Sequence, residues 1–280
     1  MIASIKSVLI GVTESIGSQG PSAALAYGFS LAQQAEAHVS VQAMAVDIVV
    51  PNAWISGFAD SLAAAENRRL KSLAETVAER ARADASAAGL RCTARARHLT
   101  ANELFGSLAA QARIHDVTVL DAEPNFVAVR RGLIEDLILY SGRPLLVVPP
   151  AAEAFTAERI VVAWDGSAPA ARAVGDALPF LRCAREVHVV TVTGEKDLSE
   201  TVPGAELGPY LARHGVPVTI VDLPMEEGSV AETLRRHAIL SRADLMVAGG
   251  FVHARLREMV LGGVTEALLT ACPVPLLLSH

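Results

Sequence analysis

Apolar residues along the chain occur in short continuous runs, and each run is followed by a segment with helical character. The run SVLIGV at 7–12 precedes an alanine-rich stretch at 21–36, and RIVVAW at 159–164 precedes a similar stretch at 168–183. Continuous runs rich in Val and Ile are typical of strands buried on both faces. The pattern therefore predicts parallel strands that alternate with helices.

The second half of the chain repeats the order of the first. Further strands are expected at 38–46, 92–99, 116–122 and 143–150, and again at 186–192, 217–223, 244–250 and 274–280. The segments TANE (100–103) and SVAE (229–232) match the capping box that opens a helix. The sequence thus predicts an α/β fold with two tandem Rossmann-like (HUP-type) domains. Each is expected to be a five-stranded parallel sheet of order 3-2-1-4-5 with helices on both faces.

The expected domain boundary lies in PPAAEAFTAE (149–158), because two prolines end the preceding strand. The domains are then residues 1–150 and 151–280. The first is longer, and its extra residues are expected in 48–89, a loop followed by a long amphipathic helix at 62–87. Trp54 and Phe58 on that loop either pack it onto the domain or form a lid or partner surface.

Composition narrows the class of protein. The 280 residues are 51% hydrophobic and 19% charged, with a net charge of −6 and no basic cluster. Nucleic acid is therefore not expected as a partner, since backbone binding needs a basic face. Three scattered cysteines fit neither a disulfide framework nor a zinc site. No apolar run reaches the roughly 18 to 20 residues of a membrane span. We expect a cytoplasmic protein without a signal peptide or membrane partner.

A ligand crevice is expected where the loops after strands 1 and 4 of each sheet diverge. In the second half these loops carry Asp165 and the pair Gly249-Gly250, and a second pair, Gly262-Gly263, opens the last helix. A carboxylate can accept hydrogen bonds from ribose or adenine, and glycine backbone and a helix N-terminus suit phosphate. The alternative stays open that these residues only form turns and that Ser167 only caps a helix.

The corresponding crevice of the first half is acidic. Glu14, Asp121 and Glu123 stand where phosphates would lie. Like charges repel, so we expect no nucleotide there.

The second half resembles the universal stress protein family, most clearly in RIVVAWDGS (159–167) and in 243–280. Members that bind ATP have an aspartate after strand 1 and a loop of the form Gly-x-x-Gly, nine residues, then Gly-Ser or Gly-Thr. The resemblance implies ATP or another adenine nucleotide in the second half, with Mg²⁺ if ATP. It also implies pairing of the two final strands as a pseudo-dimer within one chain, and a homodimer is a further expectation. The nucleotide-binding residues implied are Ala163, Asp165, Val192, Gly249, Val252, His253, Arg255, Gly262, Gly263, Val264 and Thr265.

Two positions depart from the family pattern. Val252 replaces the second loop glycine, and Gly263 replaces the hydroxyl residue. A valine restricts the backbone and occupies space near the phosphates. The lost hydroxyl removes a hydrogen bond of roughly 1.5–3 kcal/mol. Thr265 is a candidate substitute, and His253 and Arg255 either add positive charge or are solvated loop residues. We therefore expect weak or altered nucleotide binding.

No catalytic constellation is expected. The sequence contains neither a P-loop nor a nucleophile elbow, and its eight histidines show no metal-ligand spacing. We expect neither catalytic nor metal-binding residues, and at most a slow ATPase. The predicted function is a stress-response module that responds to nucleotide. The alternative is an interaction or scaffold protein that binds a protein or an apolar ligand.

Overall fold

The computed structural model describes residues 2, 4–14, 22–49, 57–122, 128–194, 204–226, 228–250 and 263–280. The first half contains the elements β1 Ser7–Glu14, α1 Ala23–Ala35, β2 His38–Val46, α2 Gly57–Ala87, β3 Cys92–Leu99, α3 Ala101–Ala112, β4 Val117–Asp121, α4 Ala128–Tyr140 and β5 Leu145–Val148. The second half contains β6 Arg159–Ala163, α5 Ala168–Leu181, β7 Glu186–Thr193, α6 Gly204–Arg213, β8 Val218–Pro224, α7 Val230–Leu240, β9 Leu245–Gly249, α8 Gly263–Ala271 and β10 Leu276–Ser279.

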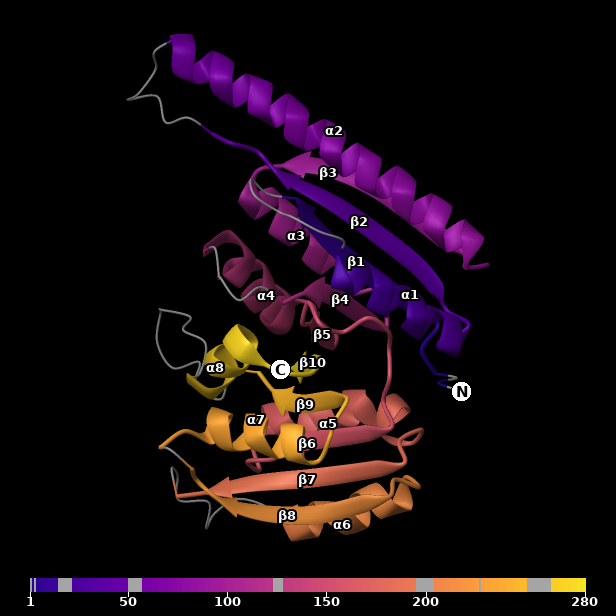
Figure 1. Ribbon diagram of the computed structural model, residues 1–280, viewed down its shortest axis with the longest axis vertical. Helices are drawn as coiled ribbons and strands as arrows, with labels where there is room; N and C mark the ends of the chain where they lie inside the picture. Colours follow the sequence, from indigo (N-terminus) through magenta and orange to yellow (C-terminus); the bar gives the residue numbers. More distant parts are fainter. Residues whose placement is uncertain are drawn as a thin grey trace.

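All of these strands belong to one sheet, of order β3-β2-β1-β4-β5-β10-β9-β6-β7-β8 (Figure 1). Within each half the strands are parallel, and their order confirms the predicted α/β fold with order 3-2-1-4-5. The halves join where β10 pairs antiparallel with β5, with Leu276 opposite Val147 and Leu278 opposite Leu145. The final strands of the two repeats are therefore interior strands of the common sheet.

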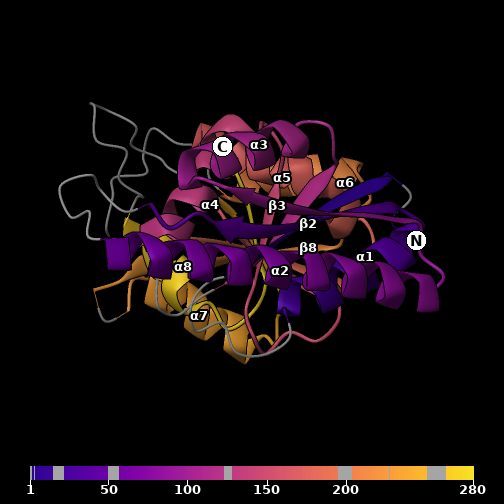
Figure 2. The same ribbon diagram turned by 90° about the horizontal axis from the view of Figure 1, so that it is seen from above.

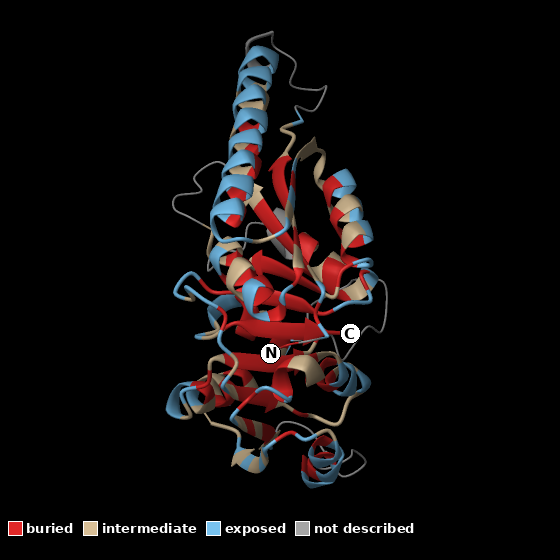
Figure 3. Cartoon of the chain, turned by 90° about the vertical axis from the view of Figure 1, so that its right-hand side faces the viewer, coloured by how far each residue is buried: buried red, intermediate tan, exposed pale blue. Residues whose placement is uncertain are grey.

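Helices cover both faces of the sheet (Figure 2). One apolar core lies beneath α1, α2, α5 and α6, and a second lies beneath α3, α4, α7 and α8. The inner strands between them are buried on both sides and red in Figure 3, and Val8, Leu9 and Ile10 are fully inaccessible. The edge strands β3 and β8 are only partly buried. This two-sided burial is the physical reason for the continuous apolar runs in the sequence.

The helices follow their predicted start signals. At α3, the Glu103 carboxylate accepts hydrogen bonds from the Thr100 N–H (3.1 Å) and hydroxyl (2.7 Å). At α7, the Ser229 hydroxyl accepts the Glu232 N–H at 3.3 Å. Helix α2 is the expected long amphipathic helix, and one alanine-rich stripe of it is buried while its outer face is exposed (Figure 3).

Helices α4 and α6 have no counterpart in the sequence-based expectations. Helix α6 contains Gly208 and Pro209, which both disfavour a helix interior and hide its apolar pattern. Helix α4 does bury an apolar stripe, which includes Leu133 and Leu137. Among the described helices, none has the length and apolar content that a membrane span requires.

The linker between the halves is anchored by an aromatic side chain. Phe155 is 2% exposed and lies between Tyr27 of α1 and Phe180 of α5, with ring centroids 5.4 and 5.7 Å away. The Gln34 side-chain amide donates a hydrogen bond of 2.8 Å to the Phe155 carbonyl. The linker therefore packs as part of the core and holds α1 and α5 together.

Candidate functional site

The loop after β6 is a tight turn that presents a carboxylate. Asp165 Oδ1 accepts the Ser167 N–H at 3.0 Å, and Gly166 adopts φ 72°, a value that favours glycine. The Ser167 hydroxyl in turn accepts the Ala170 N–H at 3.2 Å and caps α5. Asp165 itself is only partly buried. The turn thus fixes the position of this carboxylate, which remains partly exposed.

The pair Gly249-Gly250 has a packing role. A Cβ atom on Gly249 would lie 2.6 Å from the Ala170 backbone nitrogen and 2.7 Å from the Pro169 carbonyl carbon. A Cβ atom on Gly250 would lie 2.7 Å from Cγ2 of Ile138, on α4 of the first half. The end of β9 is therefore pressed against α5 on one side and α4 on the other. This contact gives both glycines a packing role.

Helix α8 begins at Gly263, as the sequence predicts, and in the described part of the chain no atom beyond its immediate neighbours lies within 4 Å of a Cβ built there. Thr265 is buried, with 6% exposure. Ala163, Val192 and Val264 all pack against the same apolar core, so the structure brings them to one face of the sheet. Four predicted site residues lie outside the described residues: Val252, His253, Arg255 and Gly262.

In the first half a carboxylate of the chain itself occupies the helix N-terminus. Asp121, the last residue of β4, accepts hydrogen bonds from the Ala24 N–H and the Ser22 hydroxyl, both at 2.7 Å. Ser22 is the cap of α1, and its hydroxyl also accepts the Leu25 N–H at 3.2 Å. An anion at this helix start is stabilised by free N–H groups and the helix dipole. Asp121 therefore holds the position that a phosphate would need. The side chains of Glu14 and Glu123 lie outside the described residues.

The two halves differ where the fourth strand of each sheet ends beside the first helix, which is β4 beside α1 in the first half and β9 beside α5 in the second. Asp121 ends β4 and Gly249 ends β9. Ala24, whose N–H bonds Asp121, is the second residue of α1, and the second residue of α5 is Pro169, which has no N–H. The first half therefore combines a carboxylate with an amide donor. The second half combines a glycine with a proline and keeps that position free of charge.

Replacing Asp121 with alanine is expected to lower the free energy of unfolding by about 2 kcal/mol, since it leaves a helix N–H and a hydroxyl without their acceptor. Urea denaturation measures the change. Asp176→Ala is the matched control, because among the described residues Asp176 pairs with the exposed Arg172, at 3.0 Å, an ion pair worth about 0.5 kcal/mol or less. Equal losses for the two variants would refute the role assigned to Asp121.

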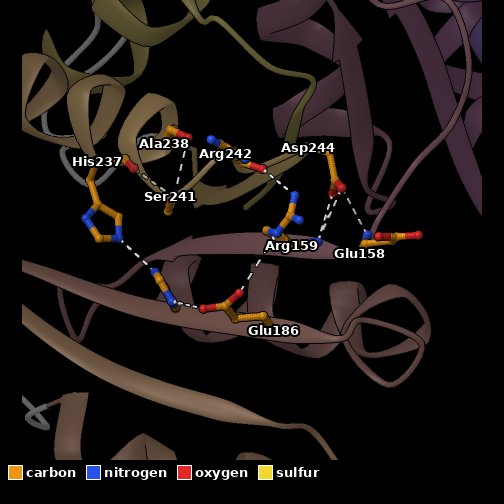
Figure 4. Close-up of polar contacts among 9 residues, drawn as sticks. Glu158, Arg159, Glu186, His237, Ala238, Ser241, Arg242 and Asp244 are labelled. Carbon is orange, nitrogen blue, oxygen red and sulfur yellow. Dashed lines mark hydrogen bonds and ion pairs between the residues drawn. The ribbon is translucent and has the colours of Figure 1, made fainter.

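A second polar cluster joins β7 to α7 at the opposite ends of the strands (Figure 4). His188 Nδ1 lies 3.0 Å from His237 Nε2, and His188 Nε2 lies 2.8 Å from a Glu186 carboxylate oxygen. The other oxygen of Glu186 lies 4.0 Å from Nε of Arg159. The sequence showed no histidine pair, because these two residues are far apart along the chain. Within the described ranges, no group of three or more His, Cys, Asp or Glu side chains could hold a metal ion.

This cluster predicts a pH dependence of stability. Burial, followed by the neighbouring His188, lowers the pKa of His237 below its usual value. A lowered histidine pKa means that the fold favours neutral imidazole. This stabilisation is complete above the unfolded pKa of about 6.5 and is lost as the pH falls below it. We expect the urea midpoint of the wild type to fall more steeply between pH 7.5 and 5.5 than that of His237→Gln. Parallel pH profiles would contradict this assignment.

Two Rossmann-like domains joined in one sheet define a tandem α/β protein. Comparisons with known proteins specify it further. The model of the universal stress protein family matches residues 156–280. The second half of the chain thus matches the universal stress protein family, and the first half repeats the same strand order.

Solved structures agree on the fold over the whole length. A universal stress protein from Archaeoglobus fulgidus is 14% identical, with a TM-score of 0.68, over 98% of this chain and 96% of that one. A functionally unknown protein from Pseudomonas aeruginosa is 15% identical, with a TM-score of 0.55, over 99% of this chain and 93% of that one. No curated protein sequence matches the chain significantly. At these identities the similarity concerns the fold alone.

Proposed function

We propose that the chain is a stress-response module that binds an adenine nucleotide weakly in its second half and none in its first. The observation that carries this proposal is the difference between the two halves at the ends of their central strands. Asp121 occupies the helix start in the first half with its own carboxylate. The second half keeps Asp165 accessible on a fixed turn and has no acidic residue at the end of β9.

In this proposal Asp165 accepts hydrogen bonds from the ribose or adenine. The phosphates lie at the start of α8, where the N–H groups of Gly263 and Val264 and the helix dipole stabilise negative charge. Because Thr265 is buried, these backbone groups are better candidates for phosphate contact than its hydroxyl. Ala163 and Val192 pack against the same apolar core. Their side chains would form the apolar side of the site.

Magnesium would enter with the nucleotide. Mg²⁺ retains several waters and is commonly held by one or two carboxylates together with substrate phosphates. Among the described residues at these strand ends, Asp165 is the carboxylate that could contribute. The donor set thus fits a cation bound mainly by phosphate. Because the site offers one such carboxylate and the proposal assigns no general base, we propose that the nucleotide is bound without being hydrolysed.

Mass spectrometry of the small molecules released on denaturing the purified protein tests the proposal. An adenine nucleotide in about stoichiometric amount supports it. An apolar molecule, or nothing even after incubation with ATP, favours a different use of the second half.

Val252, which lies outside the described residues, provides a second test. Val252→Gly removes a restricted backbone and a side chain from the loop, so we expect ATP to bind about five- to ten-fold more tightly. Fluorescence titration with a labelled ATP measures the change, and Val49→Gly, at a 70% exposed valine of the first half, controls for a general effect of replacing a valine with glycine. Unchanged affinity in Val252→Gly would show that the loop does not approach the phosphates.

One observation favours the alternative that the chain is an interaction protein. Ile239 and Leu240 end α7 and are 62% and 73% exposed, an uncommon placement for two adjacent large apolar residues. A double substitution of both residues with serine should leave nucleotide affinity unchanged. Loss of a copurifying protein in that variant would support the alternative.

A further inference from the structure

Each half carries an aspartate immediately before its fourth strand. Asp116 in the first half accepts hydrogen bonds from the Lys6 N–H at 2.7 Å, the Ser7 N–H at 2.9 Å and the Ser7 hydroxyl at 3.1 Å. These three donors tie the start of β1 to the start of β4. The Asp116 carboxylate therefore accepts three hydrogen bonds, two from backbone N–H groups and one from a side-chain hydroxyl.

Its counterpart Asp244 has fewer donors. It accepts the Glu158 N–H at 3.2 Å and the Arg159 N–H at 3.1 Å (Figure 4). Arg159 stands where the first half has Ser7, and its guanidinium points to the Arg242 carbonyl, at 3.4 Å, and toward Glu186. Among the described residues, no side chain donates to Asp244 in the way that the Ser7 hydroxyl donates to Asp116. Asp244 therefore has capacity to accept a further donor.

Asp244 lines a cavity at the junction of the two halves. The cavity has a volume of about 550 Å³, including its opening to solvent. Its walls come from three places: Tyr27 of α1, the linker at 151–156, and the segment 273–275 that precedes β10. The site thus includes parts of both halves and the linker, far from the strand ends that carry Asp165.

Tyr27 contributes a hydroxyl without a partner. The residue is 1% exposed, and its hydroxyl makes no hydrogen bond with the described part of the chain. Its ring is held edge to face against Phe155. Burial, and then the negative charge of Asp244, raises the pKa of Tyr27 far above its usual range, so the hydroxyl stays neutral. Buried polar groups are nearly always paired, so this one indicates a missing partner.

The charges around the cavity indicate which partner fits. Asp244 and Glu153 line it, and none of its described lining residues is Lys, Arg or His. An anion such as a nucleotide is therefore disfavoured. Burial raises the pKa of Asp244, and the backbone N–H groups and the charge of Arg159 offset this only in part. A cation in the cavity would offset it further. The remaining walls are largely Ala and Pro side chains, which suit a short aliphatic chain.

We propose that this junction cavity binds a small aliphatic amine in its ammonium form. The ammonium group donates hydrogen bonds to the Asp244 carboxylate and to the Tyr27 hydroxyl oxygen. Its methylene groups lie against Ala152 and Pro273. Because this ligand contacts both halves and the linker, its binding stabilises their junction independently of nucleotide.

Calorimetric titration of the full chain with n-butylammonium chloride tests this proposal, with n-butanol as the neutral analogue of similar shape and sodium chloride to match ionic strength. We expect saturable binding with a dissociation constant in the millimolar range or tighter. We expect about ten-fold weaker binding of n-butanol, and about ten-fold weaker binding of n-butylammonium to Tyr27→Phe. Tyr210→Phe, a change at a 39% exposed side chain of α6, should have no effect.

Glu153→Gln provides an independent variant, because this residue lies on the surface of the linker and its change leaves the core intact. It should weaken n-butylammonium binding and leave n-butanol binding unchanged. The proposal is overturned if the wild type does not saturate by about 50 mM, a concentration well above a millimolar dissociation constant. It is also overturned if the amine and the alcohol bind equally, or if Tyr27→Phe and Glu153→Gln both retain full affinity.

Discussion

Gly249→Ala should lower the free energy of unfolding by about 3 kcal/mol or more, the upper range for overpacking a core. The added Cβ would lie 2.6 Å from a backbone nitrogen and 2.7 Å from a carbonyl carbon in the first turn of α5. Backbone atoms at the start of a helix cannot rotate away as a flexible side chain can. Helix and strand must separate, and Gly250 beside them is itself pressed against Ile138. Urea denaturation followed by circular dichroism measures the loss.

Gly175→Ala is the matched control, because Gly175 lies in α5 and, apart from the helix backbone itself, no described atom lies within 4 Å of its Cβ position. Alanine there should raise stability by about 0.5–1 kcal/mol, since it favours the helix. If Gly249→Ala cost less than about 1 kcal/mol, well below the expected effect of overpacking, the contact between β9 and α5 would not be the reason for this glycine. The phosphate interpretation of Gly249 would then regain support.

Phe155→Ala should cost about 3–5 kcal/mol, the usual loss for truncating a buried phenylalanine. The ring contacts Tyr27 and Phe180, so its removal leaves a cavity between α1 and α5. Because these helices belong to different halves, the substitution should weaken the packing between the halves more than the packing within either half. Thermal unfolding followed by calorimetry should show a lower transition temperature and a broader transition.

Phe155→Leu separates this packing effect from a general effect of changing the linker. Leucine refills much of the space, so we expect a loss of about 1–1.5 kcal/mol. Equal losses for Ala and Leu, or losses below about 1 kcal/mol for both, would contradict the anchoring role of Phe155.

The fold could be predicted from the sequence because a strand that is buried on both faces appears as a continuous apolar run. Strands such as β1 must be apolar at consecutive positions, and the repeat of this pattern gives the order of elements in both halves. Helix α6 could not be predicted in this way, because Gly208 and Pro209 interrupt its apolar pattern. The anchor Phe155 was also missed, because a single aromatic residue in a proline-rich linker shows no periodicity.

Predicting the site from sequence was harder because it depends on contacts between distant residues. A glycine at a strand end is equally consistent with phosphate binding and with close packing, and only the position of α5 distinguishes the two for Gly249. The acidity of the first crevice was evident in the sequence, but not that Asp121 caps α1. Likewise, His188 and His237 become neighbours only when α7 packs on β7.

The central claim is that the chain keeps one adenine-nucleotide site, in its second half. Calorimetric titration with Mg-ATP tests it most directly, in the wild type, Asp165→Ala and Asp121→Ala, each checked for folding by circular dichroism. The account predicts one site per chain, with affinity about ten-fold weaker in Asp165→Ala and unchanged in Asp121→Ala. Two sites per chain, or an affinity that Asp165→Ala leaves unchanged, would contradict it.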